Sequence, residues 1–89
     1  MTSVFYSMNR KDIEMRVSRI FHELFGCDPE SLTKDSSPDN LPGWDSLQHL
    51  NLVTSIEAEF QISLDHQDVV DSLSFGLIVQ IIEDNLSLK

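Results

Sequence analysis

The sequence is poor in cysteine, in basic residues and in long apolar runs. Its single cysteine, Cys27, excludes an internal disulfide, and the N-terminal residues lack the basic start and apolar stretch of an export signal. No segment approaches the roughly 20 consecutive apolar residues that a membrane-spanning helix requires. We therefore expect a cytoplasmic protein that does not cross a membrane.

Basic residues are scarcest in the C-terminal part of the chain. Lys and Arg number 6 against 15 Asp and Glu, and between Lys34 and Lys89 there are ten acidic residues and no basic one. Such a surface repels nucleic acid and anionic lipid, so neither is an expected partner, whereas it attracts proteins with basic patches. The formal net charge of −9 also favours solubility, but solubility alone does not explain why the basic residues gather near the N-terminus.

The chain length and the spacing of apolar residues predict one small helical domain. The 89 residues have room for a single core, which we expect over roughly residues 10–86, with flexible ends at 1–9 and 87–89 and a monomeric state. Apolar residues recur at three- and four-residue spacings in 10–25, 46–60 and 74–86, which predicts three longer helices. A short helix is expected at roughly 66–71 with Asp65 as its cap, and Gly26 and Ser74 are suited to end and begin helices. No strand periodicity is present.

Particular apolar residues are expected to form the core. In the second helix these are Leu47, Leu50, Val53, Ile56 and Phe60, with Leu52 widening the stripe. Val69 and Val70 should face inward from the short helix, and Leu32 and Leu41 should fix the long polar loop at 27–43. Cys27 is expected to be a small packing residue.

The tripeptide Asp-Ser-Leu occurs twice, at 45–47 and 71–73. Asp45 is suited to cap the second long helix, which places Ser46 at the first helical position, beside unpaired backbone N–H groups that stabilise an anion. Ser72 lies between two helices, where a local turn or capping hydrogen bond is expected. Ser46 is therefore the candidate functional serine.

Nucleophilic catalysis is not favoured at Ser46. A base must be held against the hydroxyl, and His49, one helical turn away, is not reliably aimed at it. The G-x-S-x-G elbow is absent, because residues 44–48 read WDSLQ. His22, His49 and His66 have no spacing that builds a metal site, and no calcium-binding loop motif exists. A serine that itself carries a phosphate diester fits the pattern better.

The stretch GWDSLQHLNLVTSIEAEFQISL, residues 43–64, resembles the phosphopantetheine attachment segment of acyl and peptidyl carrier proteins. That family has Asp-Ser-Leu at the start of the second helix, followed by an apolar run that ends in Glu-x-x-Phe-x-Ile. The resemblance extends over roughly residues 10–86. It implies an all-α, four-helix bundle of acyl-carrier type, with a long first loop and a short third helix.

The resemblance further implies a carrier rather than an enzyme. A phosphopantetheinyl transferase would attach 4'-phosphopantetheine from coenzyme A to Ser46, and an acyl or aminoacyl group would then be held on the arm as a thioester. Asp45 would engage the transferase and its metal, and Leu47 would lie beside the cofactor. Because His49 falls where the apolar face of the second helix meets the Ser46 end, we expect it either to touch the phosphodiester or gate a pocket, or to be a partly buried surface histidine. An activating ligase and downstream transferases with basic patches are the expected partners. The candidate docking residues are Trp44, Glu57, Glu59, Asp65 and Asp68.

Some positions depart from the fatty-acid carriers of the family. Those carriers usually have a more acidic helix after the serine, whereas this chain has Gln48, His49, Asn51 and Ala58. Trp44 is more typical of discrete carriers in polyketide, peptide or other specialised pathways, although it also suits a packed anchor. The main alternative is an unmodified adaptor or complex subunit with the same fold. An acidic mimic of nucleic acid is less favoured, because apolar residues interrupt the acids.

Overall fold

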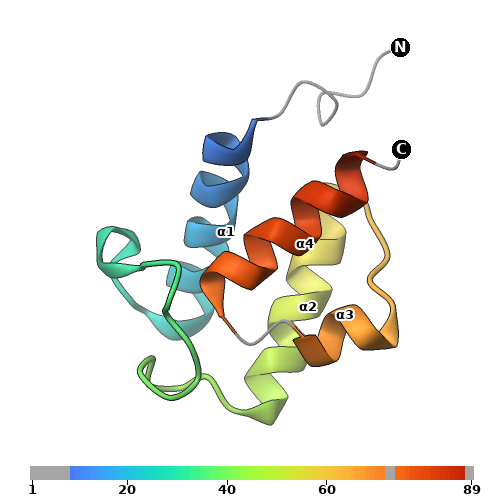
Figure 1. Ribbon diagram of the computed structural model, residues 1–89. Helices are drawn as coiled ribbons and strands as arrows, with labels where there is room; N and C mark the ends of the chain where they lie inside the picture. The colour runs from blue at the N-terminus through green and yellow to red at the C-terminus, as the bar shows by residue number, and fades with distance from the viewer. Residues whose placement is uncertain (1–8, 72–73, 88–89) are drawn as a thin grey trace.

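The computed structural model describes residues 9–71 and 74–87, and within these ranges the chain is helical and contains no strand (Figure 1). The elements are α1 (Arg10–Phe25), the short 3-10 helix η2 (Pro29–Ser31), α2 (Ser46–Phe60), α3 (His66–Asp71) and α4 (Phe75–Ser87). The expected all-α class, with three longer helices and a short third one, is confirmed. Of the ends expected to be flexible, residues 1–8 and 88–89 lie outside the described residues, and Ser87 is the last residue of α4.

Helix α1 begins and ends on local hydrogen bonds. The Asn9 side chain accepts from the backbone N–H of Asp12 at 2.9 Å, and the Asp12 carboxylate accepts from the backbone N–H of Asn9 at 3.4 Å. This reciprocal pair is a capping box, so Asn9 takes part in the start of α1, whereas the sequence grouped it with the terminal residues 1–9. Gly26 ends the helix with φ of 69°, in the left-handed region that glycine adopts at little cost.

The core is formed where α1 packs against α2 and α4. Phe21 of α1 lies at its centre and contacts the rings of Trp44 and Phe75 edge to face, with centroids 5.2 and 5.5 Å away. These contacts join α1 to the end of the long loop and to the start of α4. The remaining buried apolar residues are Ile13, Val17, Ile20, Leu52, Val53, Ile56, Phe60, Ile62, Ile78, Val79, Ile82 and Leu86.

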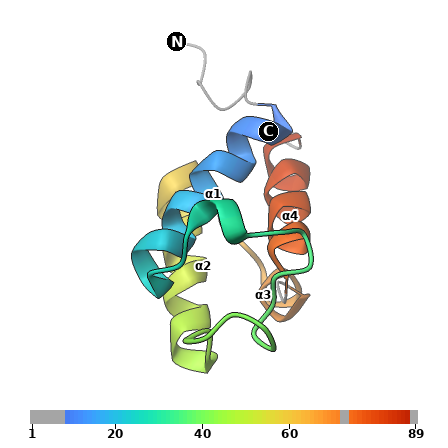
Figure 2. The same ribbon diagram turned by 90° about the vertical axis from the view of Figure 1, so that its left-hand side faces the viewer.

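The segment between α1 and α2 crosses to the N-terminal end of α4 before it returns to α2 (Figure 2). The backbone carbonyl of Lys34 accepts from the N–H of Gly76 at 3.0 Å, and that of Ser36 accepts from the N–H of Phe75 at 2.8 Å. Leu32 and Leu41 are partly buried against the core, as expected. The loop thus supplies partners for N–H groups that α4 cannot satisfy internally.

Two arginines of α1 form ion pairs with acidic residues of other helices. Arg10 lies 3.3 Å from Glu83 of α4, and Arg16 contacts Glu59 of α2. Both pairs are partly exposed, so each stabilises the fold by less than about 1 kcal/mol. They nevertheless give a structural reason for part of the charge segregation, because basic residues of α1 face acids on the two helices it packs against.

Three of the expected core residues are exposed instead. The buried face of α2 carries Leu52 and Ile56, whereas Leu50 is 58% exposed and Leu47, also on the expected stripe, is 69% exposed. Leu50 and Leu52 are separated by about 200° around a helix, so one neighbouring helix cannot bury both. Val70 of α3 is 49% exposed, which also contradicts its inward assignment, while Val69 is partly buried.

Candidate functional site

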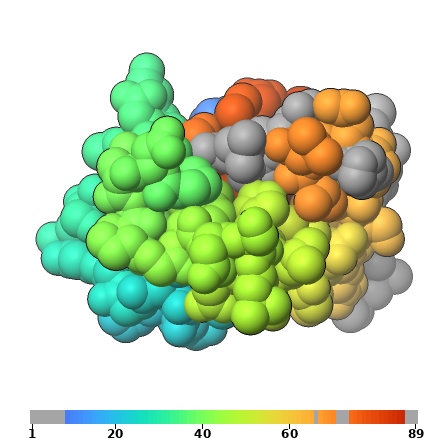
Figure 3. All heavy atoms as spheres, turned by 90° about the horizontal axis from the view of Figure 1, so that it is seen from below, coloured from blue at the N-terminus to red at the C-terminus, as the bar shows by residue number. Residues whose placement is uncertain are grey.

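Ser46 is the first residue of α2 and is exposed. It lies at the end of the molecule where the long loop delivers the chain to α2, and Figure 3 views this end with the loop on one side and α3 on the other. Both the helical position and the exposure agree with the sequence-based prediction. Ser72, the serine of the second Asp-Ser-Leu, lies outside the described residues.

Asp45 is the N-cap of α2, as predicted. Its backbone is extended, with φ of −106° and ψ of −173°, and its side chain accepts from the N–H of Gln48 at 2.9 Å. The Gln48 side chain in turn donates to the backbone carbonyl of Leu24 at 3.0 Å. Because Leu24 belongs to the last turn of α1, this bond holds the turn that starts with Ser46 against the end of α1.

Trp44 is an anchor and not a docking surface. It is only 4% exposed, and its ring packs against Phe21 and Phe25 of α1. A partner protein therefore cannot contact its side chain in this structure, and the expected docking role of Trp44 is contradicted. The burial arises because α1 ends beside the start of α2, which leaves an aromatic slot that the indole fills.

The His49 ring is directed toward Trp44 and α3. Its Nδ1 lies 3.0 Å from Nε1 of Trp44, and its Nε2 lies 2.9 Å from the backbone carbonyl oxygen of Val69. Both ring nitrogens are therefore occupied by partners other than Ser46. This contradicts the expected contact of the His49 ring with a phosphodiester, and it removes His49 as a base for nucleophilic catalysis by Ser46.

The expected docking acids Glu57, Glu59 and Asp65 have intramolecular partners, and Asp68 is not without a partner either. Glu57 accepts from the backbone N–H of Leu64 at 2.9 Å, and Glu59 pairs with Arg16. Asp65 caps α3 by accepting from the backbone N–H of Asp68 at 2.8 Å, and it remains exposed. These acids also take part in contacts within the fold, so any docking that they support is additional to those contacts.

Exposed leucines accompany Ser46 on the first turns of α2. Leu47 follows the serine directly, and Leu50 lies one turn further along. Sequence reasoning placed Leu47 beside the cofactor but also assigned both leucines to the core, so it missed the exposed position of Leu50. The available signal was that α2 has more apolar residues than one buried stripe can hold.

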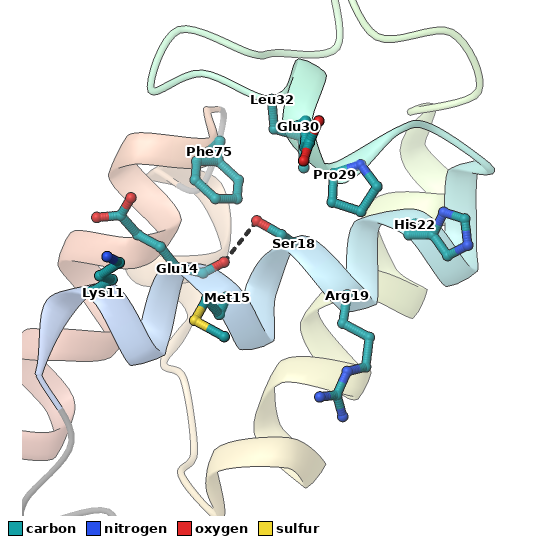
Figure 4. Close-up of a pocket in the computed structure, with 10 residues that line it drawn as sticks. All are labelled: Lys11, Glu14, Met15, Ser18, Arg19, His22, Pro29, Glu30, Leu32 and Phe75. Carbon is teal, nitrogen blue, oxygen red and sulfur yellow. Dashed lines mark hydrogen bonds between the residues drawn. The ribbon is translucent and has the colours of Figure 1, made fainter.

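A groove of about 550 Å³ lies elsewhere, on α1 (Figure 4). It is bounded by α1, by the segment around η2 and by Phe75, and Ser46 does not line it.

Cys27 is partly buried beyond the end of α1, and this burial raises the pKa of its thiol above the ordinary value. A raised thiol pKa suits the packing role expected for this residue.

Neither a metal cluster nor a membrane span is found in the part of the chain that the structure describes. Across residues 9–71 and 74–87, no group of three or more His, Cys, Asp or Glu side chains is placed to hold a metal ion. Within the same ranges, no helix is both long enough and apolar enough to cross a bilayer.

Two known proteins with sequences similar to this chain are both named acyl carrier proteins. A putative mitochondrial acyl carrier protein of Schizosaccharomyces pombe is 33% identical over 86 residues, which are 96% of this chain and 77% of that protein. The acyl carrier protein of Thermotoga maritima is 32% identical over 78 residues, 88% of this chain and 96% of its own length. A scan against models of protein families matched none of them.

The fold is also similar to that of a known acyl carrier protein. The solution structure of holo acyl carrier protein from Geobacter metallireducens superimposes with a TM-score of 0.76, covers 85% of this chain and 87% of its own, and is 25% identical. The two sequence relatives are matched along most of their length and align with the region that contains Ser46 and the helices around it. The chain therefore belongs to the acyl carrier protein family.

Proposed function

We propose that this protein carries an acyl or aminoacyl group on a 4'-phosphopantetheine arm attached to the Ser46 hydroxyl. The observation that carries the proposal is the exposed serine at the first position of α2 in a member of the acyl carrier protein family. In this role the protein is a carrier and not an enzyme. The arm would supply a terminal thiol that holds the cargo as a thioester.

The residues around Ser46 fit an attached phosphodiester. Asp45, Ser46 and Leu47 are all exposed, so a covalent group on the hydroxyl meets no covering segment in the described residues. The N-terminal end of a helix carries a partial positive charge, which favours the anionic diester. Asp45 adds a carboxylate beside it, and the two negative groups together suit a divalent cation brought by the modifying enzyme.

The attachment requires a phosphopantetheinyl transferase as a partner. The Ser46 hydroxyl gives up its proton and forms a bond to the phosphorus next to pantetheine in coenzyme A, and adenosine 3',5'-bisphosphate leaves. We propose that this enzyme, the activating ligase and the downstream transferases dock on α2 and α3 through basic patches. Exposed Leu47 and Leu50 add an apolar component to the acids Glu57, Glu59, Asp65 and Asp68.

We further propose service in a specialised pathway, in which a dedicated ligase loads one acid. The exposed positions of α2 include uncharged Asn51 and Ala58, and Glu57 and Glu59 have intramolecular partners. This arrangement leaves less acidic surface than the fatty-acid carriers of the family usually present. The test compares two ways of loading the modified protein. One reaction contains a general fatty-acid system that transfers malonyl groups, and the others contain a panel of acid ligases. Preferential malonyl loading would refute the specialised role.

We also propose that the protein is a monomer and that it is located in the cytoplasm. The net charge of −9 supports a monomer without nucleic acid or membrane partners, which light scattering and binding measurements would test. We place the carrier in the cytoplasm, whereas the name of the S. pombe relative places that protein in mitochondria. Cell fractionation distinguishes the two locations.

The modification itself is tested by intact-protein mass after incubation with coenzyme A, magnesium and a broad-specificity phosphopantetheinyl transferase. We expect a gain of one phosphopantetheine on the parent protein, none on Ser46→Ala and an unchanged gain on Ser72→Ala. Ser72→Ala is the matched control, because it alters the second Asp-Ser-Leu. A folded parent that remains unmodified with several transferases would instead favour the adaptor function.

A further inference from the structure

The hydrogen bonds of His49 specify its protonation state. The indole N–H of Trp44 can only donate, so the Nδ1 of His49 that faces it at 3.0 Å must accept and carries no proton. The carbonyl oxygen of Val69 can only accept, so the Nε2 that faces it at 2.9 Å must donate. The geometry therefore specifies a neutral imidazole with its proton on Nε2.

One end of this bridge is fixed in the core. Trp44 is buried against Phe21 and Phe25, and the planes of the Trp44 and His49 rings are inclined by only 22°, with centroids 5.9 Å apart. The small angle between the planes suits a hydrogen bond that lies in the plane of both rings, so the indole orients the imidazole through its N–H. Since rotation of the ring would break both hydrogen bonds, His49 presents its Nε2–H in one direction.

The other end of the bridge is the backbone of α3. This helix has only 6 residues, too few to be stable without contacts to the rest of the fold. It lies beside α2 near the end that carries Ser46 (Figures 1 and 3). Val69 is only partly buried and Val70 is 49% exposed, so apolar burial holds this helix less firmly than the longer ones.

We propose that His49 is a positioning residue that holds α3 at a set place relative to Ser46, so that a partner enzyme meets a preformed surface around the serine. The proposal rests on the function proposed above, because its enzymatic consequence is measured on the modification of Ser46. His49 acts here through Trp44 and Val69, and not by contact with the reacting atoms. The loss of its bond to α3 should weaken recognition of the carrier while the serine and its helix remain in place.

The first test is spectroscopic and needs no partner enzyme. Long-range proton–nitrogen NMR correlations of His49 should show the Nε2–H tautomer in the parent protein. In His49→Leu, amide exchange in α3 should accelerate about fivefold, the factor expected for one hydrogen bond, and by more than the exchange in α1 and α4. Equal acceleration in all helices would mean a general loss of stability and would overturn the proposal, as would the Nδ1–H tautomer.

The second test is kinetic. With the phosphopantetheinyl transferase, His49→Leu should raise the KM for the carrier about fivefold and leave kcat within about twofold, because binding and not chemistry is affected. His49→Gln, whose amide offers one acceptor and one donor, should restore much of the KM. Leu52→Ala is the control, since it destabilises the core without touching the bridge and should leave the KM near that of the parent.

The outcomes separate the two proposals. An unmodified parent protein refutes the carrier function, while the tautomer and exchange measurements still decide whether His49 holds α3. A modified parent with an unchanged KM in His49→Leu refutes the positioning role alone. A KM that rises equally in His49→Leu and Leu52→Ala also refutes it, because stability would then explain the effect.

Discussion

Replacing Gly76 with alanine sets helix propensity against packing at the start of α4. By propensity, alanine is more favourable than glycine in a helix by about 1 kcal/mol, so stabilisation would be expected from sequence. The structure predicts the opposite, because a Cβ at this position would lie 3.0 Å from both the Cβ and the backbone carbonyl oxygen of Lys34. The N–H of Gly76 also donates to that carbonyl at 3.0 Å, so the loop cannot retreat without stretching the bond.

The magnitude follows from three contributions. Overpacking typically costs about 1–3 kcal/mol, and a weakened backbone hydrogen bond costs up to about 1 kcal/mol more. The propensity gain of about 1 kcal/mol offsets part of this. We therefore expect Gly76→Ala to lower the free energy of unfolding by roughly 0–3 kcal/mol, and to lower the melting temperature by about 4–8 °C for each kcal/mol lost.

Urea denaturation followed by circular dichroism measures this change. The matched control is Ala58→Gly, which makes the reverse exchange at an exposed position of α2 and should cost about 1 kcal/mol. If Gly76→Ala instead stabilises the protein by the amount that Ala58→Gly destabilises it, propensity alone decides. The close approach of the loop to α4 would then be refuted.

Three further predictions test other parts of the structure. In urea denaturation, Leu52→Ala should lower the free energy of unfolding by about 2–5 kcal/mol, because Leu52 is buried, and exposed Leu50→Ala by less than about 0.5 kcal/mol. Similar losses in the two variants would contradict the assigned faces of α2. Asp45→Ala should lower the free energy of unfolding by about 1 kcal/mol, whereas Asp45→Asn, which keeps the cap, should lower it little. Equal losses in the two variants would argue against capping by Asp45. Because burial raises the pKa of the Cys27 thiol, Cys27 should react with iodoacetamide more slowly than free cysteine at neutral pH. Its rate should increase as the pH rises. A rate above that of free cysteine at neutral pH would contradict this prediction.

The features that the sequence predicted correctly depend on short-range interactions. Asp45 caps α2 because its carboxylate reaches an N–H three residues away, and Gly26 ends α1 because it tolerates a positive φ. Both effects act within one helical turn, so the order of the residues is enough to reveal them. The position of Ser46 at the start of α2 follows from the same local rule, and this is why the candidate attachment site could be named from sequence.

The features that the sequence left open depend on which elements become neighbours. The apolar residues of α2 cover more than one face, and only packing against α1 decides that Leu52 is buried while Leu50 is exposed. Gly76 looks like a weak helix position until Lys34, distant in sequence, is found against it.

The bridge through His49 joins local and distant partners. The pairing with Trp44 spans five residues, but the bond to Val69 exists only because α3 returns beside α2. Sequence alone thus determined the helices, the caps Asp45 and Asp65 and the position of the serine, since these are set by neighbouring residues along the chain. Tertiary structure alone decided the faces, the buried indole and the orientation of His49, because each depends on contacts between segments that the chain brings together only when it folds.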